Sequence, residues 1–182
     1  MVSIVAHNDI RRSTDGKYDA LRINGGSSSG DMTLPLPPAF IGYTIAATVN
    51  VPAGSSLHIP AGTVLKLGSG VQFTVSGTLS VDGRAHGMPY LPVVFTSYRD
   101  DDWLGDTNGD GPTSGAAGDW GRLQLNSGSN QSVLRGVVFR FGGSGSQGQV
   151  LVNNTGAQVS PSVHLIDCHF DLALAVGGLR AT

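Results

Sequence analysis

The chain has 182 residues, which is enough for one domain with a full apolar core. Only 13% of the residues are charged, and the 13 acidic residues are all Asp. With no Glu and only two lysines, Lys17 and Lys66, the chain lacks the usual residues of helix surfaces, which excludes a helical bundle. A net charge of −2 and no basic cluster larger than Arg11-Arg12 exclude a nucleic-acid binder. No apolar run is long enough for a membrane span, and the first residues lack the pattern of a signal peptide.

The first stretch, residues 1–47, is irregular. The run 25–30 (GGSSSG) is a flexible loop by composition, and the run 35–38 (PLPP) interrupts any strand ladder. A piece of this size is too small to form a core of its own. We therefore expect one domain over residues 1–182, with this stretch as a loop leaving its main body.

Between residues 48 and 83, short runs of alternating apolar residues are separated by small turn-forming residues. Alternation over a few residues is the period-2 pattern of a β-strand. The Asn-Gly and Asp-Gly pairs that favour hairpins are scarce, so the pattern predicts many short strands that are not joined as hairpins. The expected strands are centred on Val49–Val51, Leu57–Ile59, Val64–Leu67, Phe73–Val75 and Leu79–Val81.

The spacing of these runs predicts stacking. Val49 and Phe73 are 24 residues apart, and Leu57 and Leu79 are 22 residues apart. Three short strands per circuit of this length would place like residues above like residues, as in a solenoid whose rungs bury apolar side chains against their neighbours. The expected fold is therefore an all-β solenoid, with a β-sandwich or jelly roll as the alternative.

A second repeat lies nearer the C-terminus, where 132–139 (SVLRGVVF) and 163–170 (VHLIDCHF) share one frame at a spacing of 31 residues. The opening run 3–10 (SIVAHNDI) fits the same frame, and 19–23 follows it much as 178–181 follows the last copy. The chain would then end at the phase where it begins, with half-made β-edges at both ends. Such edges need a cap, a neighbouring repeat or a partner, so we expect copies to associate through the ends of the solenoid.

The order of the motifs resembles the right-handed parallel β-helix repeat domains of large bacterial secreted and cell-surface proteins. The motifs that carry the resemblance are VNVPAGSSLHIPAGTVLKLGSG (49–70), TVSGTLSVDG (74–83), PVVFTSYRDDD (92–102), GDTNGDG (105–111) and GDWGRLQL (118–125). The resemblance implies a right-handed parallel β-helix with a long acidic loop insertion. It also implies an internal segment of a longer chain, located outside the cell or on its surface. Because lyases, hydrolases, epimerases and adhesins share this fold, the resemblance does not select an activity.

The acidic insertion, residues 97–121, separates a strand at Val93–Thr96 from one at Arg122–Leu125. Residues 100–119 contain six Asp and no Lys or Arg, whereas the rest of the chain contains seven Asp and eleven basic residues. Carboxylates at this density repel one another, and a hard divalent cation that takes oxygen ligands relieves the repulsion. The insertion is therefore the best candidate for a metal site.

The spacing D-x-N-x-D-G would place Asp106, Asn108 and Asp110 on one side of a curled loop, with Gly111 allowing the sharp turn. The pattern resembles the first half of an EF-hand or dockerin loop. It departs from that loop at the twelfth position, because Ala117 cannot supply a bidentate carboxylate.

The missing ligands would have to come from Asp101, Asp102 and Asp119. We expect a structural Ca²⁺, because Mg²⁺ demands stricter octahedral geometry. The alternative is a solvated polar loop whose Asp and Asn side chains cap their own turns. For Trp103 and Trp120 we expect packing of the loop onto the solenoid, with stacking against a sugar ring as the alternative.

An active site is not evident in the sequence. The Gly-His-Gly and Arg-x-Lys elements of β-helix polygalacturonases are absent, and no motif links the candidate basic residues of a lyase, Arg99, Arg122 and Arg135. The single cysteine, Cys168, excludes an internal disulfide and is expected to be a buried, unreactive thiol.

We therefore expect a non-catalytic structural or adhesive segment stabilised by calcium, with a glycan or a surface protein as a partner. The alternatives are a polysaccharide-active lyase or glycoside hydrolase and a carbohydrate-binding module on the same scaffold.

Overall fold

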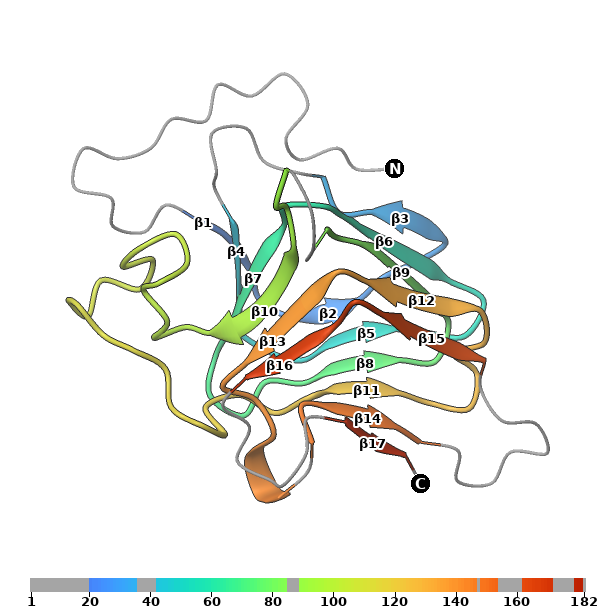
Figure 1. Ribbon diagram of the computed structural model, residues 1–182. Coiled ribbons are helices and arrows are strands. Elements are labelled where there is room, and N and C mark those ends of the chain that lie inside the picture. The colour runs from blue at the N-terminus through green and yellow to red at the C-terminus, as the bar shows by residue number, and fades with distance from the viewer. Residues whose placement is uncertain are drawn as a thin grey trace.

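The computed structural model describes residues 20–35, 42–84, 89–146, 148–153, 162–171 and 179–181. Its strands form three sheets in which every paired strand is parallel, and the chain visits the three sheets in turn (Figure 1). Helix is almost absent from this part of the chain, which contains a short 3-10 turn at Ser144–Ser146. The expected all-β, stacked parallel architecture is confirmed, and the arrangement is compatible with a parallel β-helix.

The three sheets are named A, B and C, and in each of them the strands stack in the order in which they occur along the chain. Sheet A contains β1 (Ala20–Ile23), β4 (Gly42–Ile45), β7 (Val64–Leu67), β10 (Val93–Ser97), β13 (Val137–Arg140) and β16 (His169–Asp171). Sheet B contains β2 (Gly26–Ser27), β5 (Val49–Val51), β8 (Phe73–Val75), β11 (Leu123–Leu125), β14 (Val150–Val152) and β17 (Leu179–Ala181). Sheet C contains β3 (Asp31–Thr33), β6 (Ser56–Pro60), β9 (Thr78–Asp82), β12 (Ser132–Arg135) and β15 (Val163–Ile166).

The strand registers confirm the predicted spacings. Val49 pairs with Phe73 in sheet B, and Leu57 pairs with Leu79 in sheet C. The second repeat is also confirmed, because β12 pairs with β15 and β13 pairs with β16 in the frame that the sequence indicated. Like residues therefore lie above like residues, as expected for rungs that bury apolar side chains only against their neighbours.

The expected equivalence of the two ends is wrong. Ala20–Ile23 pairs with β4 in sheet A, whereas Leu179–Ala181 pairs with β14 in sheet B. Short apolar alternations look alike in all three sheets, so the period of 2 identifies a strand without identifying its side of the solenoid. The opening run 3–10 lies outside the described residues. The expectation that residues 1–47 form a loop leaving the main body is wrong for the described part of this stretch, because β1, β2 and β3 add one strand to each of the three sheets. Strands as short as β2 and β3 carry little apolar alternation, so the sequence pattern did not reveal them.

The core fills the space between the three sheets. In β6 and β9 the inward residues are buried and alternate with half-buried outward residues, which explains the period-2 pattern. Sheet A contributes a ladder of aromatic rings, in which Phe139 stacks on Phe95 at 5.2 Å and on Phe170 at 5.1 Å between ring centroids. Such ring pairs add about 0.5–1.5 kcal/mol each to the free energy of burial.

Sheet A differs from the others because the outer face of its inner strands, β4, β7, β10 and β13, is also largely buried. Val64, Val94 and Val138 point away from the main core and form a second apolar cluster, on which Trp103 and Leu104 pack. Both of these residues belong to the long segment 98–122 between β10 and β11, which corresponds to the predicted acidic insertion. The insertion therefore folds back over three neighbouring strands, β7, β10 and β13.

No helix among the described residues combines the length and apolar character that a membrane span requires.

Candidate metal centre in the acidic loop

Apolar contact and one buried lysine hold the acidic loop, residues 98–122, against the outer face of sheet A. Leu104 has a left-handed backbone (φ 64°), and its side chain lies so close to Gly42 that a Cβ there would be 2.3 Å from Leu104 Cδ1. Beside it, Lys66 of β7 is fully buried, and its Nζ donates a hydrogen bond of 2.6 Å to the carbonyl oxygen of Gly105. The loop thus covers a charged side chain that would otherwise extend into solvent.

A buried ion pair anchors the start of the loop. The Asp100 side chain is 0% exposed, and Arg140 Nη1 of β13 donates to it at 2.9 Å. Thr96 of β10 donates its hydroxyl proton to the same carboxylate, and Arg140 Nη2 reaches Asp102 at 2.9 Å. Burial raises the pKa of Asp100, while the Thr96 hydrogen bond and the Arg140 charge oppose that rise. Two of the six acidic residues of the loop are therefore partnered by arginine.

The turn D-x-N-x-D-G is built around the carboxylate of Asp106. Its Oδ1 accepts backbone N–H groups of Gly109 at 2.6 Å and Asp110 at 3.2 Å, and its Oδ2 accepts that of Gly111 at 3.0 Å. Gly109 and Gly111 have positive φ values of 76° and 86°, which only glycine adopts without strain. The spacing of the motif is explained by this turn, in which one side chain organises the following backbone.

Three carboxylates converge beside this turn. Asp101, Asp106 and Asp110 each offer an oxygen atom, and these atoms lie within 4.8 Å of one another. Asp101 Oδ2 accepts the N–H of Thr113 at 2.7 Å, and Asp110 Oδ1 accepts the Thr113 hydroxyl at 3.0 Å. Asp101 Oδ1 is buried without a hydrogen-bond partner and lies 3.9 Å from Lys66 Nζ. A group of this kind could hold a metal ion.

The other three predicted ligands lie elsewhere in the loop. Asp102 faces Arg140, and its side chain is 68% exposed. Asp119 Oδ2 accepts the Ser97 hydroxyl at 2.7 Å and the N–H of Ala116 at 2.9 Å. Asn108 Oδ1 is buried without a hydrogen-bond partner. Asn108 and Asp119 share a polar hollow of about 320 Å³ whose other lining residues are Ser69, Ser97, Tyr98 and Arg99.

Lys66 is the residue of this site that the sequence reasoning missed. The three clustered carboxylates and Lys66 together carry a formal charge of −2, so one lysine leaves two negative charges uncompensated. Burial lowers the pKa of Lys66, and the neighbouring carboxylates, Asp101 foremost, oppose that shift. The signal in the sequence was a single lysine inside the apolar run Val64–Leu67.

The two tryptophans pack the loop onto the body of the protein, as expected. Trp120 is 0% exposed, belongs to the main core, and donates its Nε1 proton to the carbonyl oxygen of Arg140 at 2.7 Å. Stacking of Trp120 on a sugar ring is therefore excluded. Trp103 packs on the outer cluster of sheet A. Cys168 is half-buried, whereas a buried thiol was expected, and burial raises the pKa of this thiol.

Comparison with protein-family models, curated proteins and solved structures finds no match to this chain.

Proposed function

We propose that this chain is a non-catalytic structural or adhesive segment of a secreted or cell-surface protein, built as a right-handed parallel β-helix and stabilised by calcium. The observation that carries the proposal is the convergence of Asp101, Asp106 and Asp110 within 4.8 Å in a loop that closes over sheet A. Calcium would act as a clamp on the loop, and the stacked strands would serve as a stiff spacer or a binding surface for a glycan or a surface protein.

Charge supports a divalent ion at this cluster. The residual formal charge of −2 beside Lys66 equals the charge that one Ca²⁺ neutralises. Ca²⁺ prefers carboxylate, carbonyl and water oxygens and tolerates irregular geometry, which suits a cluster built from one loop. Asp101, Asp106 and Asp110 would hold the ion, and water and backbone carbonyl groups would complete its shell. The ion would supply electrostatic stabilisation and no chemistry.

The energetic need for a clamp follows from the length of the loop. Ordering a residue costs about 1–2 kcal/mol of backbone entropy, and the loop spans 25 residues, from 98 to 122. Its apolar contacts with the outer valine cluster of sheet A are made by Trp103 and Leu104. A ligand present at about 100 times its Kd adds about 2.7 kcal/mol to the stability of the folded state.

Thermal unfolding in EDTA and in millimolar CaCl₂ tests the proposal, with the double variant Asp106→Ala and Asp110→Ala beside the parent. We expect calcium to raise the Tm of the parent and to leave that of the double variant unchanged. Asp102→Ala is the matched control, because Asp102 lies on Arg140 outside the cluster, and it should keep the calcium response. Identical curves for the parent in EDTA and in calcium would overturn the clamp.

A further inference from the structure

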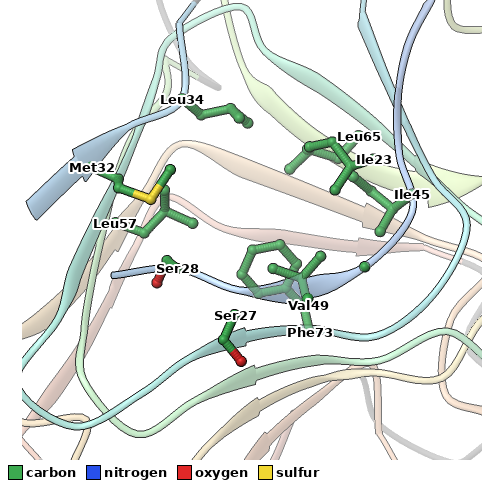
Figure 2. A pocket seen from close by; sticks show the side chains of 12 residues that line it. Ile23, Ser27, Ser28, Met32, Leu34, Ile45, Val49, Leu57, Leu65 and Phe73 are labelled. Carbon is green, nitrogen blue, oxygen red and sulfur yellow. The ribbon is translucent and has the colours of Figure 1, made fainter. Parts of the chain in front are cut away.

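The end of the stack formed by β1, β2 and β3 contains an apolar hollow of about 200 Å³ (Figure 2). Its floor is formed by side chains of the next strands of the stack, among them Ile45 of β4, Leu57 of β6 and Phe73 of β8. Met32 and Leu34 stand at its rim, and Met32 is 40% exposed. The interior of the solenoid is therefore open at this end within the described part of the chain.

The hollow exists because one column of the core lacks its side chains. Gly26 pairs with Val49 in sheet B. It stands in the same column as Val49, Phe73, Leu123 and Val150, which supply apolar side chains in the later rungs. A Cβ built on Gly26 would have no neighbour within 4 Å, so the space beside it is empty. The first rung is thus missing apolar volume that every later described rung of sheet B supplies.

The opposite end of the stack also presents a rung that is covered on one side only. Among the described strands, β15, β16 and β17 each pair with one neighbour, as do β1, β2 and β3. Leu165 and Phe170 pack against the core from within but stay only half-buried. Within the described part of the chain, backbone hydrogen-bonding groups and apolar surface therefore lie together at both ends, which is the usual condition for pairing with another chain.

We propose that the β1–β2–β3 end docks the β15–β16–β17 end of a second copy of this chain. All strands are parallel, so a head-to-tail copy continues each sheet: β16 pairs with β1, β17 with β2, and β15 with β3. In this register Phe170 pairs with Leu21, in the column of the aromatic ladder, and Leu179 pairs with Gly26 in sheet B. The proposal does not depend on calcium.

Charge favours the same register. In the strand register of sheet A, Arg140 of β13 lies opposite Asp171 of β16, and Arg22 of β1 lies opposite Thr44 of β4. These residues belong to the same outward-facing column of the sheet. Docking of β16 on β1 would place Asp171 of one copy beside Arg22 of the next, at the strand separation of about 4.8 Å. Both residues are exposed, so they are able to meet. Because the two contacting surfaces differ, the association does not close on a dimer and extends into a filament.

Sedimentation velocity and light scattering over a range of concentrations test the docking, with charge reversals at the two ends. We expect the parent to form particles that grow with concentration. Arg22→Asp and Asp171→Arg should each raise the concentration needed for assembly about two- to tenfold, as for an exposed ion pair turned repulsive. The double variant should recover the behaviour of the parent. Arg84→Asp makes the same charge change between β9 and β10, away from both ends, and should have no effect.

Two results would overturn the proposal. One is a parent that stays monomeric at every concentration, as it would if another part of the same chain covers the hollow. The other is a parent that assembles while the double reversal fails to restore what the single reversals lose, because the ends would then not meet in this register. Circular dichroism of each variant confirms that the strands remain folded.

Discussion

Replacement of Arg140 by Met tests how the acidic loop is anchored to sheet A. Arg140 is 16% exposed and pairs with Asp100, which is 0% exposed. Removal of one partner from a buried ion pair costs about 3–5 kcal/mol, because a charge is left buried without compensation. Met retains an apolar stem against Phe141, over which the guanidinium lies at 4.8 Å. For a chain of this length, a loss of about 3 kcal/mol lowers the Tm by roughly 6–12 °C.

The cost of Arg140→Met should depend on pH, and the sign follows from Asp100. Burial raises the pKa of Asp100, and Arg140 opposes that rise, so the pKa is higher still in the variant. A carboxyl whose pKa is higher in the folded state favours folding when it is protonated, and this contribution is lost as the pH rises through the folded pKa. The variant should therefore lose most stability near neutral pH. The loss should shrink as the pH falls toward the ordinary Asp pKa of about 4.

Chemical unfolding measures the free energy of unfolding at neutral pH and near pH 4.5. The proteins compared are the parent, Arg140→Met, Asp100→Asn and the double variant. The comparison of each variant with the parent at the same pH removes the titration of the remaining carboxylates. We expect the double variant to be more stable at neutral pH than Arg140→Met alone, because the Asn side chain needs no counter-charge. A cost that is equal at both pH values, or a double variant no better than the single one, would refute the reasoning.

Two further predictions concern the core and the buried lysine. Phe139→Ala should lower the free energy of unfolding by about 3–5 kcal/mol, because Phe139 is fully buried between two stacked rings. Phe170→Ala should lower it by less, because Phe170 is half-buried at the end of the ladder. Denaturant titration measures both free energies, and equal losses would contradict the ladder. Burial lowers the pKa of Lys66 in the folded state below its ordinary value of 10.5. Between these two pKa values the folded protein binds fewer protons than the unfolded chain, so the free energy of unfolding should rise with pH across that interval. Lys66→Met should remove this rise in alkaline unfolding curves, and a rise that persists in the variant would assign it to another group.

Strand spacing was the part of the structure that the sequence predicted well. The intervals from Val49 to Phe73 and from Leu57 to Leu79 are set by the length of one circuit, so they are visible in a single chain. The sheet to which a run belongs is not visible in this way, because each sheet imposes the same alternation. That is why the runs at 20–23 and 179–181 were equated although they lie in sheets A and B.

The sequence contains a pattern that indicates coverage of the outer face of sheet A, but the search for alternating residues did not detect it. The runs Val93–Phe95 and Val137–Phe139 are continuously apolar, which indicates strands buried on both faces rather than on one. Another segment has to cover the outer valines, and the long acidic insertion lies between these two strands in the sequence. The pairing of Asp100 with Arg140 could not be predicted, since 40 residues separate them and their contact depends on the stacking of β10 beside β13.

The acidic loop spans three rungs, and this has a consequence for the way the protein yields to force. Its contacts reach Lys66 on β7, Thr96 on β10 and Arg140 on β13, which are neighbouring strands of sheet A. A stack held only by nearest-neighbour contacts peels apart one rung after another from its ends. In this protein the loop connects the three rungs of β7, β10 and β13 across their outer surface, so these rungs should unfold in a single step. Tension applied along the stack would then give gradual lengthening from the outer rungs, followed by one abrupt extension of the middle.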